Sequence, residues 1–149
     1  MILLAHMIFG AIFGSMFQNP ILAIVLAFLS HYFLDLFPHI EYPIVNIHDK
    51  NWKKSLPDFL KVLLDFLFGL LIIYIFSKNY LIIYICAFFA IVPDGLTLVT
   101  SIFPNFLKLH HKIHTENIHY LTKQKNFPKF WKILTQIIVV IISAILLKY

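Results

Sequence analysis

This sequence has no arginine and a single cysteine, and charge of either sign is scarce. The 149 residues include one cysteine, Cys86, so a disulfide within the chain is impossible and zinc sites built from cysteine are excluded. Only 13% of the residues are charged and 60% are hydrophobic, which leaves too little polar surface for a soluble globule of this size. All 12 basic residues are lysines, and no basic helix or stacking platform accompanies the net charge of +5. We therefore expect an integral membrane protein that does not bind nucleic acid.

Five apolar stretches predict an all-α fold, an integral membrane bundle of about five transmembrane helices. The expected helices cover about 2–17, 21–37, 59–76, 80–103 and 131–147. A spanning helix needs roughly 17 to 25 apolar residues, so the first two and the last are at the short limit. No internal repeat and no linker rich in Gly or Ser divides the chain, which predicts a single domain over residues 1–149. The first residues lack the basic segment of a signal peptide and are expected to remain as the first membrane helix.

Lysine is concentrated in the two long connections, about 38–58 and 104–130. With five helices both connections lie on one side of the membrane, and an excess of lysine is typical of the cytoplasmic side. We therefore expect a protein of the plasma (inner) membrane with a cytoplasmic N-terminus. The oligomeric state stays open.

Ionisable side chains inside the apolar stretches are the strongest functional signal. Asp35, Asp65 and Asp94 lie in expected helices, where a carboxylate costs at least about 2.5 to 3.5 kcal/mol at the bilayer centre. His31 and Asp35 are four residues apart, so a helix places both on one face as a clamp for a metal ion. The expected topology brings four further imidazoles to the same depth: His6, His110, His111 and His114.

These donors predict a divalent metal site, either for Zn²⁺ or for a two-metal centre with Mn²⁺ or Fe²⁺. The expected ligands are His6, His31, Asp35, Asp94, His110 and His114, with His39 and His111 as candidate additional ligands. For hydrolysis of a substrate at such a metal, Asp65 is expected to orient or deprotonate the water that attacks the substrate, and Glu116 is the other candidate catalytic carboxylate. Lys108 and Lys112 are expected to hold the head group of a substrate.

A short motif from Ser30 to His39 carries a family resemblance. The pattern Ser-His-x-x-x-Asp-x-x-Pro-His, together with Pro93-Asp94, the histidines of 110–114 and His6, resembles the YdjM-like membrane-bound metal-dependent hydrolases. The resemblance covers roughly residues 1–118 and implies a metal-dependent hydrolase. Combined with the depth of the expected site, it suggests a lipid or lipid-linked phosphoester at the cytoplasmic leaflet as the substrate.

Two other functions stay open at this point. A small transporter could use the same groups as a relay for protons or metal ions, and a non-catalytic assembly protein would bind no metal. Individual residues also have simpler interpretations. Asp65 could pair with Lys61, Asp94 could mark a break in its helix, and Asp58 is expected to be a solvated loop residue.

Overall fold

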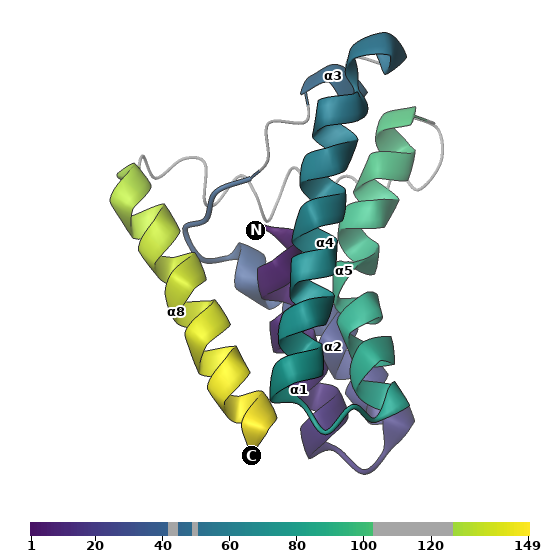
Figure 1. Ribbon diagram of the computed structural model, residues 1–149, viewed down its shortest axis with the longest axis vertical. Helices are drawn as coiled ribbons and strands as arrows, with labels where there is room; N and C mark the ends of the chain where they lie inside the picture. Colours follow the sequence, from purple (N-terminus) through teal and green to yellow (C-terminus); the bar gives the residue numbers. More distant parts are fainter. Residues whose placement is uncertain (42–44, 49–50, 103–126) are drawn as a thin grey trace.

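The computed structural model describes residues 1–41, 45–48, 51–102 and 127–149, and within these ranges all regular structure is helical (Figure 1). The all-α prediction is confirmed. The five long helices are α1 (Leu3–Met16), α2 (Pro20–Asp35), α4 (Leu56–Phe76), α5 (Leu81–Ile102) and α8 (Lys129–Lys148). Their ends lie within three residues of the predicted ends. A short α3 (Val45–His48) and a 3-10 turn, η1 (Trp52–Lys54), precede α4.

Three of these helices, α4, α5 and α8, are long and apolar enough to cross a membrane. The apolar α1 and α2 have 14 and 16 residues. At a rise of 1.5 Å per residue they measure about 21 to 24 Å, which is less than the hydrocarbon thickness of about 30 Å. The described chain therefore fits a membrane protein with three candidate spans and two shorter helices beside them.

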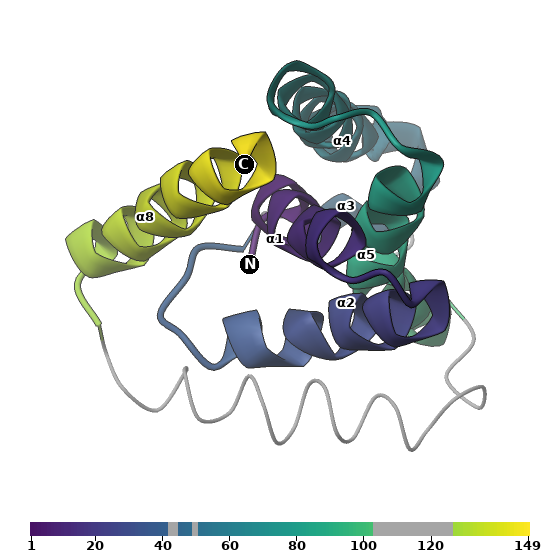
Figure 2. The ribbon, with the colours of Figure 1, turned by 90° about the horizontal axis from the view of Figure 1, so that it is seen from below.

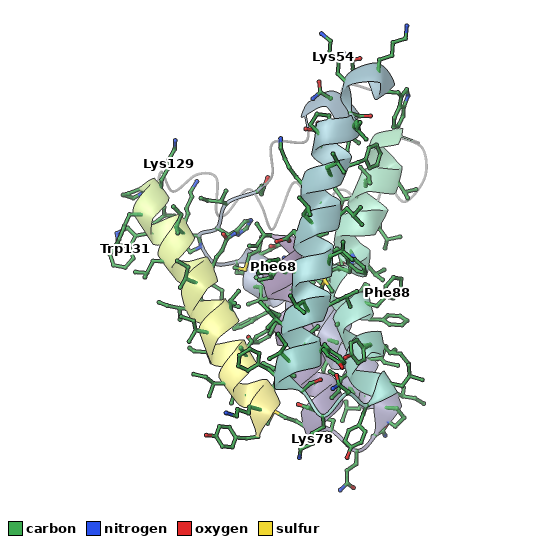
Figure 3. The ribbon with its side chains drawn as sticks, viewed as in Figure 1. Lys54, Phe68, Lys78, Phe88, Lys129 and Trp131 are labelled. Carbon is green, nitrogen blue, oxygen red and sulfur yellow. The ribbon has the colours of Figure 1, made fainter. Side chains whose placement is uncertain are left out.

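The outer surface of the bundle has the polarity expected for contact with lipid. Figure 3 shows Lys54 and Lys78 at opposite ends of the bundle. Phe68 and Phe88 lie between these ends and are 60% and 57% exposed. Large apolar side chains therefore face outward over the middle of the bundle, as on a protein whose surroundings are hydrocarbon.

The core of the bundle is formed around α1, which lies between α2, α4, α5 and α8 (Figure 2). Glycine permits this close packing. A Cβ atom added at Gly14 would lie 2.7 Å from the Cα atom of Ile83, and one added at Gly10 would collide with the Cβ atom of Ala90. The backbones of α1 and α5 therefore approach each other closely along this line.

The contact between Gly10 and Ala90 sets the register of the two helices, which run in opposite directions (Figure 1). His6 lies one turn before Gly10, and Asp94 lies one turn after Ala90. In an antiparallel pair these two steps lead the same way along the bundle. The packing of α1 on α5 therefore brings His6 and Asp94 to the same level.

The prediction that Asp58 is a solvated loop residue is wrong. Asp58 lies in the first turn of α4 and is 2% exposed. Its Oδ2 atom accepts hydrogen bonds from the backbone N and the Nδ2 atom of Asn46, both at 3.1 Å, and Lys61 Nζ lies 3.4 Å from its Oδ1 atom. Asp58 therefore fastens α3 to the start of α4.

Replacing Asp58 by alanine should lower the free energy of unfolding by about 1 to 3 kcal/mol, because it leaves the donors of Asn46 without an acceptor. The Lys61→Ala variant is the control, since this lysine is 49% exposed and such a pair contributes about 1 kcal/mol at most. Thermal unfolding in detergent, followed by circular dichroism, measures both. Equal losses of stability would show that the bonds to Asn46 contribute little.

Candidate metal centre

Four ionisable side chains from three helices meet where α1 begins and α2 ends. His6 comes from α1, His31 and Asp35 come from the last turns of α2, and Asp94 comes from α5. The side chains of His6, His31 and Asp35 are fully buried, whereas that of Asp94 is 31% exposed. The structure thus brings together the four predicted ligands that lie within its described residues.

The distances among these side chains are short. Asp35 Oδ1 lies 3.2 Å from His6 Nε2, and Asp35 Oδ2 lies 3.2 Å from His31 Nε2. His31 Nε2 also lies 3.6 Å from Asp94 Oδ1. The rings of His6 and His31 are stacked with their centroids 4.0 Å apart. His6, His31 and Asp94 each offer one ligand atom within 4.8 Å of the others, and they form the only such group in the part of the chain that the structure describes.

The backbone of α5 fixes the ring of His31. Pro93 lies inside α5 and has no N–H group, so the helical hydrogen bond to the carbonyl of Phe89 is missing. The ring of His31 bonds the next carbonyl along the helix. The carbonyl oxygen of Ala90 accepts a hydrogen bond of 2.8 Å from His31 Nδ1. α5 nevertheless continues through Pro93 and Asp94, so Asp94 does not mark a break in the helix.

The bond to Ala90 determines which nitrogen of His31 can bind a cation. A carbonyl oxygen only accepts hydrogen bonds, so Nδ1 carries the proton and Nε2 of the neutral ring carries a lone pair. That lone pair faces the carboxylates of Asp35 and Asp94. Lone pairs repel one another, so a cation, either a proton or a metal ion, is needed between them. Metal-binding histidines commonly donate their other N–H to a backbone carbonyl in this way.

The ring nitrogens of His6 are also available to bind a metal ion. Neither of its ring nitrogens has a hydrogen-bond partner among the described residues, although Nε2 lies close to Asp35. Burying an unpaired polar group costs about 1 to 3 kcal/mol. A metal ion would use the lone pair of one of these nitrogens and so remove part of this cost.

The spacings fit a metal coordination shell better than a set of hydrogen bonds. Bonds of 2.0 to 2.1 Å at tetrahedral angles place neighbouring ligand atoms about 3.3 Å apart. Within the group of four, the imidazole-to-carboxylate distances are 3.6 Å between His31 and Asp94 and 3.2 Å from Asp35 to each of the two imidazoles. A charge-assisted hydrogen bond would be shorter, about 2.7 to 2.9 Å. The donor set of two imidazoles and nearby carboxylates suits a divalent transition metal.

Asp65 has a structural contact that the sequence does not reveal. Its Oδ2 atom accepts a 2.8 Å hydrogen bond from the backbone N of Leu4, at the start of α1. Lys61, its suggested partner, lies against Asp58 instead. The catalytic role predicted for Asp65 stays a prediction.

His39 lies beside the group of four. His39 is 7% exposed, and its Nε2 atom is 3.8 Å from Asp35 Oδ1 and 3.5 Å from Glu41 Oε1. Six predicted site residues lie outside the described residues: Lys108, His110, His111, Lys112, His114 and Glu116.

Sequence reasoning missed two groups near the site. The amino group of Met1 donates a buried hydrogen bond of 2.7 Å to Asp35 Oδ1. Glu41 approaches His39 from the segment that follows α2. The nearness of Met1 to His6 and of Glu41 to His39 in the sequence was the available signal for both.

Comparisons with protein families, with curated proteins and with solved structures give no match for this chain. The resemblance to the YdjM-like hydrolases therefore stays a prediction from short motifs.

Proposed function

We propose that this protein is a membrane-embedded, metal-dependent hydrolase that binds one divalent metal ion through His6, His31 and Asp94. The observation that carries the proposal is the buried Nε2 atom of His31, which faces two carboxylates while Nδ1 donates to Ala90. Zn²⁺ suits this donor set best, with Mn²⁺ and Fe²⁺ as alternatives. Three protein ligands leave a coordination position for water or substrate, as in catalytic zinc sites.

A divalent metal in such a site polarises a phosphoryl or acyl oxygen and makes water a better nucleophile at neutral pH. Asp35 contacts both imidazoles, so we assign to its Oδ2 atom the proton that leaves the attacking water. This is the role that the sequence suggests for Asp65, whose carboxylate instead binds the amide of Leu4. The hydrogen bond to Ala90 keeps the ring of His31 in the orientation needed for binding.

The substrate we propose is a lipid or lipid-linked phosphoester. Its support is the position of the site where the short apolar helices α1 and α2 pack on α5, which is long and apolar enough to span a membrane, together with the partial exposure of Asp94. The lysine-rich connections favour the cytoplasmic leaflet of the inner membrane and a cytoplasmic N-terminus. Lys108 and Lys112 are the proposed contacts for the head group.

A transporter is less well supported by the packing of the core. A relay needs ionisable groups across the whole bundle. Among the described residues, the core between the site and the hairpin end of α1 is apolar, with Ile8, Ala11 and Ile12 of α1 packed near Ile73 and Ile83. The ionisable groups that we assign to the site therefore gather at one end of α1.

Two aspartate substitutions test the proposed function. Protein purified in detergent should contain about one metal ion per chain and should hydrolyse a member of a phospholipid panel, with activity lost to a chelator and restored by Zn²⁺. Asp94→Asn should lose the metal, because it removes a ligand. Asp35→Asn should keep the metal but lower hydrolysis by about 100-fold or more, the usual effect of losing a general base.

Elemental analysis and phosphate release measure these two properties separately. Wild-type protein with no more metal than a chelator-treated sample would contradict the metal site. Bound metal with ion flux in proteoliposomes, but without hydrolysis, would favour the transporter.

A further inference from the structure

Gln136 is a buried amide in the otherwise apolar helix α8. It is 7% exposed and lies in one of the three helices long enough to cross a membrane. An amide in such a place is costly unless it is hydrogen-bonded. Its Nε2 atom donates a 2.8 Å hydrogen bond to the carbonyl oxygen of Ile40, which is 96 residues away in the sequence. The bond therefore joins α8 to the segment that follows α2.

This segment, residues 36–41, lies against the site. It leaves α2 and turns back toward α1 on the side that α8 occupies (Figure 2). The amides of Leu36 and Phe37 bond back to carbonyls of α2, which fixes its beginning. Further along, His39 faces Asp35, and Ile40 is held from α8. The segment has no helical or strand structure after residue 36, so its course depends on such individual contacts.

The contact from Gln136 falls one residue after His39. The ring of His39 is fixed on one side by a 2.7 Å hydrogen bond from Nδ1 to the carbonyl oxygen of Phe37. Its Nε2 atom lies 3.8 Å from Asp35 Oδ1. α8 packs chiefly on α1 and α4. Its bond to Ile40 is a further contact, with the segment that follows α2, on the α2 side of the site. Loss of the hydrogen bond from Gln136 would release the end of residues 36–41, the segment that lies over Asp35.

We propose that Gln136 is a positioning residue of the metal centre, which holds residues 36–41 over the site and slows the release of the bound divalent metal. The inference rests on the proposed function, because it requires a metal in the site. It adds a contribution from α8, a helix that provides none of the proposed ligands. Nothing in the motifs around His31 indicates such a contribution.

The Gln136→Leu variant removes the donor at nearly constant size. The matched control is Ser143→Ala, because Ser143 is also a buried polar residue of α8 and its Oγ atom has no hydrogen-bond partner within the described ranges. Zn²⁺-loaded protein in detergent is mixed with excess chelator, and the rate of metal loss is recorded. We expect the metal content to be unchanged and release to be about tenfold faster in Gln136→Leu, a factor that corresponds to about 1.4 kcal/mol and so to about one hydrogen bond. The control should release its metal at the wild-type rate.

Hydrogen exchange in the same samples separates a local effect from a loss of folding. Amides of residues 36–41 should exchange faster in Gln136→Leu, while those of α1 and α5 keep their protection. Metal release at the wild-type rate in Gln136→Leu would overturn the role of Gln136 and leave the proposed function intact. A wild-type protein that binds no Zn²⁺ would overturn the proposed function, and this inference with it.

Discussion

Replacing His31 by alanine is expected to remove the bound metal while the bundle stays folded. Among the described residues, the imidazole is the one side chain shown to contact the carboxylates of both Asp35 and Asp94 while it is also fixed by a backbone carbonyl. Losing a group that only supports a ligand weakens metal binding by about 10- to 100-fold, so losing a ligand should exceed the upper end of that range. Elemental analysis and a zinc-binding titration of detergent-purified protein measure the effect.

Ser30→Ala is the matched control for this experiment. Ser30 is the neighbouring residue, is 5% exposed, and donates its hydroxyl to the carbonyl oxygen of Ala27 in its own helix. It should keep the full metal content, since it offers no contact to the site. If His31→Ala bound metal as tightly as wild type, His31 would not be a ligand and the proposed metal site would be wrong.

The largest effect on stability is expected from Gly14→Ala. The added Cβ atom would lie 2.7 Å from Ile83 Cα, 2.8 Å from the carbonyl oxygen of Ile82 and 2.9 Å from the backbone N of Ile83. These are backbone atoms, so no side-chain rotation can relieve the collision and α1 must move away from α5. Overpacking of this kind costs about 1 to 3 kcal/mol, sometimes more. We expect a lower unfolding temperature and, because His6 moves relative to Asp94, weaker metal binding.

Gly95→Ala is the control for the same helix pair. A Cβ atom added at Gly95 meets nothing within 4 Å among the described residues. Alanine in a helix is favoured over glycine by about 0.5 to 1 kcal/mol, so this variant should unfold at the same or a higher temperature. Equal destabilisation by the two substitutions would show that the contact of Gly14 with Ile83 is not tight.

The helices and the gathering of His6, His31, Asp35 and Asp94 could be predicted because both depend on local patterns. Long apolar stretches produce helices, and a spacing of four residues puts His31 and Asp35 on one face. Gly10 and Ala90 lie one turn from His6 and Asp94 in the sequence, and small residues are typical of the faces on which membrane helices pack closely. These signals are all contained within single helices.

The remaining contacts could not be predicted because each joins a side chain to a distant part of the backbone. The carboxylate of Asp65 binds the amide of Leu4, Asp58 binds the amide of Asn46, and Gln136 binds the carbonyl of Ile40. Every residue except proline has such an amide, so no residue type marks the partner. Only the folded arrangement decides which one lies within reach.

In a bilayer, the shortness of α1 and α2 would place the proposed metal centre inside the electric field of the membrane. Their shared turn lies at the same end of the bundle as the turn between α4 and α5 (Figure 1). Helices of about 21 to 24 Å end about a quarter of the hydrocarbon thickness short of the other surface, and the ligands lie near those ends. Moving one elementary charge across the whole membrane at 100 mV changes its free energy by about 2.3 kcal/mol. Moving a dication through a quarter of the field therefore changes its free energy by about 1 kcal/mol. With the site open to the cytoplasm, as proposed, a negative-inside potential opposes entry, and metal occupancy falls as the membrane becomes energised.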